Sequence, residues 1–245
     1  MEDEVFLGIN DNQPVYRTQR AVALFVQQYR RLSMQLHSFF RSATSHRVRI
    51  ALNLKGLAYD YVAVDLRADA HLNPAFRAIN PQALLPVLDT GEGKLIQSPA
   101  ILEWLEEVYP TPPLLPSGAG QRAHVRAMAA IVGCDIHPLN NKRILTQLRR
   151  QFGADESVVN AWCGQWMSAG FDALEAILAA DKARGIFCYG GVPSMADVYL
   201  VPQIESARRF AVDVAAWPHI AAVEAACMSL PAFVTAAPSC QPDAP

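Results

Sequence analysis

Several signatures that would assign a protein class at once are missing from this sequence of 245 residues. The five cysteines are scattered, odd in number and never spaced as CxxC, which argues against a disulfide framework. The six histidines show no HExxH or similar spacing, so we expect no metal site. This cysteine usage is typical of reduced thiols, and we predict a cytoplasmic protein.

Charge and long apolar runs are scarce as well. Only 18% of the residues are charged, the net charge is -2 at pH 7, and Lys and Arg form no block. Phosphate neutralisation needs clustered Lys and Arg, so we expect no nucleic-acid partner. No apolar run is long enough to cross a membrane, so we expect no membrane association. With 51% hydrophobic residues, the chain can form one or two soluble domains with a sizeable core.

Residues 1–33 do not resemble the start of the first domain. Their opening stretch has no clear period, acidic residues come first, and no signal-peptide cleavage site follows an apolar core. We predict that residues 1–33 are a disordered extension, or that the start is misassigned and the native chain begins at Met34.

The next residues alternate between strand and helix patterns. A βαβ unit followed by a hairpin and a helix predicts a thioredoxin-like α/β domain over 34–109. The expected strands are 36–40, 59–66, 84–88 and 94–96. The first helical segment is expected to follow a polar turn over 41–45 and to reach 54, and the others run from 73 to 79 and onward from 98.

A segment rich in proline and glycine separates this half from the rest. Residues 110–120 hold four prolines and two glycines, which cannot continue a helix, so we predict a linker. Beyond it, 121–245 is predicted to be all helical, with a Ser-x-x-Asp capping signal at Ser194 and an extended tail over 236–245. The expected helices are 121–152, 155–180, 194–210 and 220–229.

The junction between the first strand and the first helix carries hydroxyl groups. Ser42, Thr44 and Ser45 stand at a helix N-terminus, where hydroxyls and free N–H groups favour an anion such as a carboxylate or thiolate. The plainer interpretation is that these side chains only cap the helix.

Six motifs in order resemble the zeta-class glutathione transferases. Residues 41–52, RSATSHRVRIAL, are similar to the class signature R-S-S-C-S-W-R-V-R-I-A-L. The chain also has Asn80-Pro81-Gln82 with Leu85-Pro86, the pair Gln97-Ser98, Val201-Pro202-Gln203, Arg209-Phe210 with Val212-Asp213, and Gln241-Pro242-Asp243. The resemblance covers 34–245 and implies the cytosolic glutathione transferase fold: a thioredoxin-like N-terminal domain and an all-α C-terminal domain.

The resemblance also implies a reaction. The variant R-S-x-T-S-H, with CDIHPLNN at 134–141, looks most like the bacterial glutathione-dependent maleylpyruvate isomerases. Such an enzyme uses glutathione as cofactor, acts on a small diacid by reversible thiolate addition, and is a homodimer. Isomerisation of maleylacetoacetate, general transferase activity, dehalogenation of α-halo acids and a non-enzymatic adaptor stay open as alternatives. The joint presence of Ser42, Pro86, Gln97 and Ser98 argues against the adaptor.

Glutathione-binding roles follow by resemblance. Ser42 is expected to donate to the thiolate, and Thr44, at the position of the family cysteine, is the alternative partner. Leu85 before a cis Pro86 is expected to pair with the cysteinyl backbone of glutathione. The remaining glutathione-binding residues are Gln97 and Ser98, expected at the γ-glutamyl carboxylate, and His137 and Asn141, expected to reach glutathione from the second domain. Ordinary caps and a structural histidine are the competing interpretations.

Candidates for holding the substrate carboxylates are Arg41, Arg209 and either Lys142 or Arg143. The planar guanidinium can bind both oxygens of a carboxylate. Each of these residues could instead be an ordinary solvated surface charge. His46 stands where the family has Trp, and the sequence assigns it no role.

Overall fold

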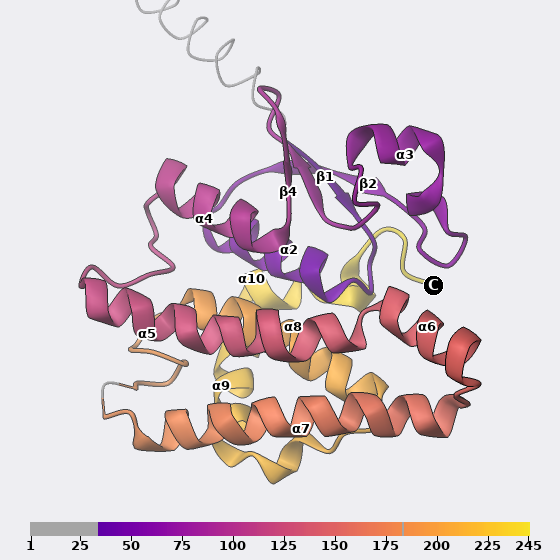
Figure 1. The fold of residues 1–245 in the computed structure, drawn as a ribbon. Helices are drawn as coiled ribbons and strands as arrows, with labels where there is room; N and C mark the ends of the chain where they lie inside the picture. Colours follow the sequence, from indigo (N-terminus) through magenta and orange to yellow (C-terminus); the bar gives the residue numbers. More distant parts are fainter. Residues whose placement is uncertain (1–33, 183) are drawn as a thin grey trace, which may run out of the picture.

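The computed structural model describes residues 34–182 and 184–245, so the predicted extension over 1–33 lies outside the described residues. A small sheet with helices on both faces sits above a larger group of helices (Figure 1). We call residues 34–109 the sheet part and residues 119–245 the helical part. Within the described residues, no helix is long and apolar enough to cross a membrane.

The sheet has four strands in the order β2-β1-β3-β4. β1 pairs parallel with β2 and antiparallel with β3, and β3 pairs antiparallel with β4. In this register Leu36 lies beside Tyr61 on one side and Leu88 on the other, and both leucines are fully buried. The strands are β1 (Met34–Ser38), β2 (Tyr59–Ala63), β3 (Val87–Asp89) and β4 (Lys94–Ile96).

Three of the expected strands differ from the observed ones at their ends, and the fourth, 94–96, is confirmed. The first strand ends at Ser38 because the chain turns at Phe39, whose carbonyl accepts the Ser42 N–H at 2.9 Å. The second ends at Ala63, not at residue 66. The third begins at Val87, after Ala83 adopts a left-handed φ of 56° and the Leu85–Pro86 bond is cis.

Helices cover both faces of the sheet (Figure 1). α2 (Ala43–Leu54) and α4 (Ser98–Val108) pack together on the face turned toward the helical part, where α2 also contacts α8. The short α3 (Pro74–Ile79) places Phe76 in a separate small core with Phe39 and Phe40. Because α2 is covered on both sides, even its polar residues Arg47 and Arg49 are buried.

The centre of the helical part is α8, which is buried over most of its length and contacts α2, α5 and α9. The α-helices of this part are α5 (Ala119–Ala130), α6 (Lys142–Phe152), α7 (Glu156–Ala180), α8 (Met195–Arg209), α9 (Pro218–Met228) and α10 (Pro231–Val234). The capping signal is confirmed, since the Asp197 carboxylate accepts both the N–H and the hydroxyl of Ser194 at 2.7 Å.

The prediction of one continuous helix over 121–152 is wrong. The segment breaks into α5, a π-helical turn (Ile131–Ile136), a 3-10 turn (His137–Asn140) and α6. Pro138 cannot donate a helical hydrogen bond, and Asn141 starts α6 afresh by accepting the Arg143 N–H at 3.1 Å.

A buried ion pair fixes the segment between the two parts. Lys55 donates to Glu106 at 3.0 Å and to the carbonyl of Pro112, while Glu106 accepts the N–H groups of Leu114 and Leu115. One hydrophobic core continues through both parts. The division into two domains with a linker at 110–120 therefore stays a prediction, and α5 already begins at Ala119.

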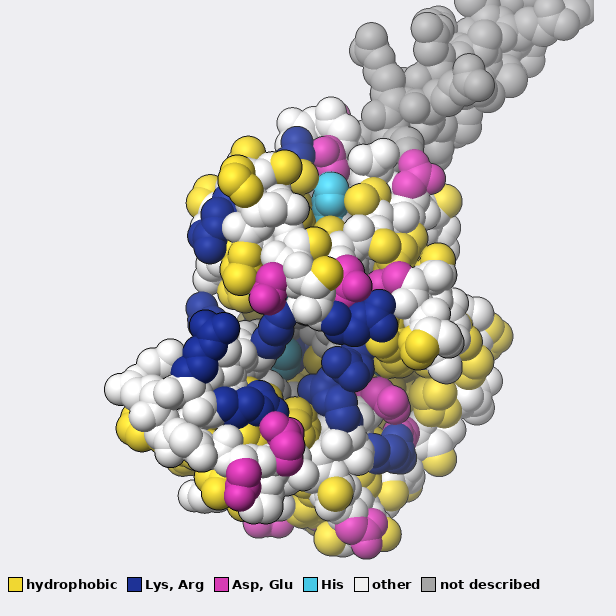
Figure 2. All heavy atoms as spheres, turned by 90° about the vertical axis from the view of Figure 1, so that its right-hand side faces the viewer, with side chains coloured by type: hydrophobic (Ala, Val, Ile, Leu, Met, Phe, Trp, Pro, Cys, Tyr) yellow, Lys and Arg dark blue, Asp and Glu magenta, His cyan; other side chains and the backbone are white. Residues whose placement is uncertain are grey.

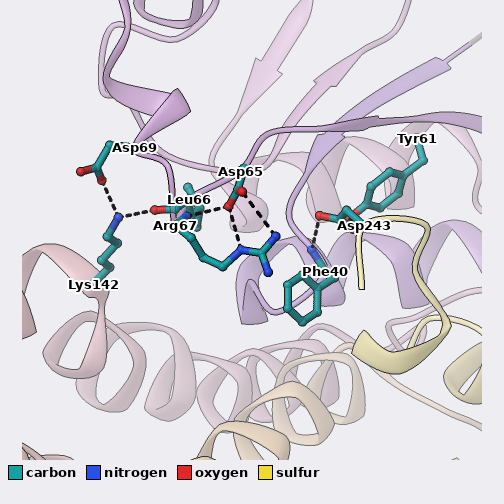
Figure 3. Close-up of polar contacts among 8 residues, drawn as sticks. All are labelled: Phe40, Tyr61, Asp65, Leu66, Arg67, Asp69, Lys142 and Asp243. Carbon is teal, nitrogen blue, oxygen red and sulfur yellow. Dashed lines mark hydrogen bonds and ion pairs between the residues drawn. The ribbon is translucent and has the colours of Figure 1, made fainter. Parts of the chain in front are cut away.

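The tail over 236–245 is folded back, so the expected extended tail is wrong. It forms a 3-10 turn (Pro238–Cys240), and its Ala236 carbonyl accepts a hydrogen bond from buried Arg49 at 2.9 Å. Asp243 accepts the Phe40 N–H at 3.0 Å and the Tyr61 hydroxyl at 2.7 Å (Figure 3). The tail thus holds the turn that leads into α2.

Candidate functional site

The centre of the site is the turn at the N-terminus of α2. Ser42 is the N-cap, and its Oγ accepts the Ser45 N–H at 3.3 Å. Thr44 Oγ1 donates to the carbonyl of Leu85 at 3.0 Å and also lies 3.0 Å from Ser42 Oγ. The capping role of Ser42 is therefore present in the structure, and the same hydroxyl belongs to a chain of polar contacts.

This chain fixes where the protons lie. A hydroxyl has one proton, and Thr44 uses its proton on the Leu85 carbonyl. Ser42 must then be the donor in the contact between the two hydroxyls. The Ser42 proton can turn toward an incoming anion, whereas redirecting the Thr44 proton would also break the bond to Leu85. The structure thus gives the two hydroxyls different positions and different freedom.

A pocket of ≈ 110 Å³ lies beside this turn. It joins Thr44 with residues predicted to bind glutathione, and the Leu85–Pro86 bond is cis, as expected. Lining residues from the sheet part include Leu85, Pro86, Gln97 and Ser98. Gln97 has a left-handed φ of 68°, and the buried Ser98 begins α4 beside it. An anion next to Ser98 would meet the positive end of this helix.

The helical part supplies the opposite wall. His137, Asn141 and Arg143 all line the pocket, although the helix expected to carry them is broken. Burial, together with the nearby charges of Arg47 and Arg209, lowers the pKa of His137 to about 3. His137 is therefore neutral near pH 7, and its Nδ1 has no partner within the described protein. Asn141 uses its side-chain oxygen to cap α6.

Positive charges gather at the mouth of the site. Figure 2 shows Lys and Arg side chains around a hollow between the sheet part and the helical part. Desolvation lowers the pKa of Arg209, and the like charge of Arg41 adds to this shift, so these two predicted residues lie within electrostatic reach of each other. Arg209 stacks on Phe210 at 4.7 Å, and Arg41 on Phe40 at 5.8 Å.

The neighbours Lys142 and Arg143 are placed differently. Lys142 donates to the Leu66 carbonyl and to the Asp69 carboxylate, which joins α6 to the loop after β2 (Figure 3). Arg143 instead lines the pocket. Of the two, Arg143 is thus the residue with access to a ligand in this structure, while a role for Lys142 in substrate binding stays a prediction.

Two arginines were missed from the sequence: Arg47, which lines the pocket, and Arg67, which lies against the aromatic residues before the Ser42 turn. Arg47 is 1% exposed yet lines the pocket, and the sequence assigned it no role beyond its place in the motif over 41–52. Arg67 is bound to Asp65 by two nitrogens and stacks on Phe39 and Phe40 at 5.6 Å (Figure 3). The two arginines at positions 47 and 49, among the apolar residues of α2, could have indicated a buried role for Arg47. No sequence pattern indicated the contacts of Arg67.

His46 faces away from this pocket. It lines a separate cavity of ≈ 330 Å³ together with Arg208 and Glu224, and burial lowers its pKa well below the usual value. No group of three metal-binding side chains was found among residues 34–182 and 184–245.

Comparison with known proteins was made on both sequence and structure. Residues 36–113 match the family described as glutathione S-transferase, N-terminal domain. The chain is 64% identical over 210 residues to the maleylpyruvate isomerase of Ralstonia sp., an alignment that spans 86% of this chain and 99% of that protein.

Solved structures agree with this similarity. The holo structure of a maleylpyruvate isomerase, described as a bacterial zeta-class glutathione S-transferase, has a TM-score of 0.85 and 63% identity, covering 86% of this chain and all (100%) of the other. A maleylacetoacetate isomerase from Methylobacterium extorquens AM1, solved with bound malonate and GSH, has a TM-score of 0.84 and 39% identity, covering 86% and 99%.

Proposed function

This chain belongs to the zeta class of glutathione transferases, and we propose that it is a glutathione-dependent cis–trans isomerase that converts maleylpyruvate into fumarylpyruvate. The hydroxyl chain from Ser42 through Thr44 to the Leu85 carbonyl supports this most directly, because it holds a donor at the positive end of α2. Bound glutathione would supply a thiolate that adds to the double bond, lets the resulting single bond rotate, and then leaves.

The residues of the pocket fit glutathione. Ser42 can turn its proton toward the sulfur, and the α2 dipole also favours negative charge there, so both effects lower the thiol pKa. Leu85 offers backbone groups to the cysteinyl part, and Gln97 with Ser98 offers an anion site at the start of α4. Neutral His137 can exchange hydrogen bonds with the peptide without adding a charge.

The diacid is expected to bind at the basic mouth. Arg143 lines the pocket, the charge of Arg209 reaches His137 in its wall, and the charge of Arg41 reaches Arg209. The described residues show no ion pair for any of these three arginines. Unpaired guanidinium groups suit a dianion, since each can hold a carboxylate through two nitrogens. The relative that was solved with malonate, itself a dicarboxylate, supports a site of this kind.

A second candidate substrate is maleylacetoacetate. The Methylobacterium relative is a maleylacetoacetate isomerase, and both diacids need similar anion clamps. The deciding experiment measures kcat/KM for each diacid with the purified protein and glutathione. We expect thiol-dependent loss of the cis diacid, with the higher kcat/KM for maleylpyruvate. A higher value for maleylacetoacetate would reverse the assignment, and no glutathione binding at all would favour an adaptor.

Assembly and location complete the proposal. We place the protein in the cytoplasm, where thiols stay reduced, and Cys163, Cys188 and Cys227 are buried free thiols consistent with that setting. We also expect a homodimer.

A further inference from the structure

Arg47 is a buried charge without a matching carboxylate. It is 1% exposed, and it forms no ion pair with any residue in 34–182 or 184–245. Its Nε and Nη2 atoms have no partner in the described protein. Burial lowers its pKa to about 10, which still leaves the guanidinium charged near pH 7. An unpaired buried charge is costly, so the fold retains this one against a substantial penalty.

The surroundings of Arg47 hold it in one orientation. The guanidinium lies over the Tyr199 ring at 4.2 Å, a cation–π contact. Tyr199 in turn packs against Gly133 in the π-helical turn, where an added Cβ would come within 2.9 Å of the ring. The stack of Gly133, Tyr199 and Arg47 therefore forms a built wall, and Gly133 and Arg47 both line the glutathione pocket.

The remaining contact of Arg47 points to what it acts on. Nη1 donates to Ser98 Oγ at 3.4 Å. Because the Ser98 oxygen accepts this bond, its own proton is free to donate toward the pocket. Ser98 also opens α4, whose dipole favours an anion at the same place. A charge, an oriented hydroxyl and a helix terminus thus converge on one spot.

The geometry points to Arg47 as a positioning residue that makes the pocket selective for a thiol carrying an α-carboxylate. Arg47 orients the Ser98 hydroxyl and supplies the buried positive charge that the γ-glutamyl carboxylate of glutathione neutralises. This inference rests on the proposed function, because it takes glutathione as the ligand. It adds a residue from the first helix to the predicted carboxylate site of Gln97 and Ser98.

The test compares two ligands that differ by one carboxylate. Dissociation constants are measured by calorimetry for glutathione and for γ-aminobutyryl-cysteinyl-glycine, which lacks only the α-carboxylate. The wild-type protein should prefer glutathione. Arg47→Met should weaken glutathione binding about ten- to a hundredfold and leave the analogue within about twofold, so that the preference collapses. In turnover, Arg47→Met should raise the KM for glutathione and leave kcat at saturation nearly unchanged.

Controls separate this role from a purely structural one. Tyr199→Phe keeps the ring beneath the guanidinium and should keep the preference. Arg47→Lys keeps the charge but loses the planar fork, and it should show a smaller loss, again larger for glutathione than for the analogue. If Arg47→Met does not fold, the ligand preference of Arg47→Lys tests the inference in its place.

Two results would overturn the inference. If the Arg47 variants weaken both ligands by the same factor, or neither, Arg47 is structural and the proposed isomerase function still stands. If the wild-type protein binds neither ligand, the proposed function fails as well.

Discussion

The two hydroxyls at the start of α2 differ in how their protons are held. Thr44 is committed to the Leu85 carbonyl, while Ser42 donates only to Thr44. Ser42→Ala should therefore raise the pKa of bound glutathione thiol and slow addition to any electrophile about ten- to a hundredfold, the effect of losing a donor to a charged group. Titration of the thiolate absorbance in the binary complex checks this.

Thr44→Val serves as the matched control for Ser42→Ala. It removes the bond to Leu85 but leaves the Ser42 donor in place, so its effect on the thiol pKa should be smaller. A larger effect for Thr44→Val than for Ser42→Ala would make Thr44 the thiolate partner.

Arg209 should act on the diacid and not on glutathione. Its position at the end of α8, within reach of the charge on Arg41, motivates this. Arg209→Ala should reduce kcat/KM for maleylpyruvate far more than for conjugation of an uncharged electrophile. The neighbouring Arg208, which is paired with Glu224, supplies the control, since Arg208→Ala should affect both substrates little. Equal losses of both activities in Arg209→Ala would make Arg209 structural.

His137 should make stability depend on pH. Its folded-state pKa of about 3 lies below the usual 6.5, so the unfolded chain binds the proton first as the pH falls. The stabilisation is complete above pH 6.5 and is lost progressively toward pH 3. Between about pH 7.5 and about pH 5, His137→Gln should lose about 1–2 kcal/mol less of its unfolding free energy than the wild type. Urea denaturation at both values tests this, and identical losses would contradict it.

At the scale of elements, the sequence predicted the starts of helices well where a short capping motif marks them. The Ser42 cap, the Ser194 capping box and the start of α4 at Ser98 were all readable from short motifs. The break of the expected helix was readable in part, since Pro138 and Asn141 stand in the sequence, but the π-helical turn after Ala130 had no such local signal. Arg47 was missed because nothing local shows that α2 is covered on both sides.

The capping box of α8 should matter more than an ordinary cap. Asp197 is fully buried and accepts bonds from Cys188 N–H and from both Ser194 donors. Asp197→Ala would leave these donors unpaired and should lower the unfolding free energy by about 2–4 kcal/mol. Asp155→Ala, at the exposed cap of α7, should cost only about 0.5–2 kcal/mol. Equal losses in thermal and urea unfolding would contradict this ranking.

At the scale of the whole molecule, the two-part outline was predictable and the joining of the parts was not. The six motifs indicated the fold because each is a short stretch that can be recognised without knowing its contacts. The ion pair of Lys142 with Asp69 and the folded tail depend on residues far apart in sequence, and no pattern at either end indicates its partner. The sequence could not show that Lys142 pairs with Asp69, and Lys142 was therefore predicted to bind the substrate.

The proposed homodimer can be tested directly. The described surface exposes large apolar side chains, including Phe152 at 69% and Val108 at 48%, which association could cover. Light scattering at micromolar concentration should give twice the mass of one chain. A single-chain mass would contradict the proposal.

The bond between Asp243 and the Phe40 N–H has a consequence for biosynthesis. The two residues are separated by 203 positions. Arg49 likewise donates to the carbonyl of Ala236, 187 positions further along the chain. The ribosome therefore releases the turn before Ser42 long before it makes the residues that fasten it. A nascent chain can form β1 and α2 early, but the turn before Ser42 gains its bond to Asp243 only after translation has passed residue 243.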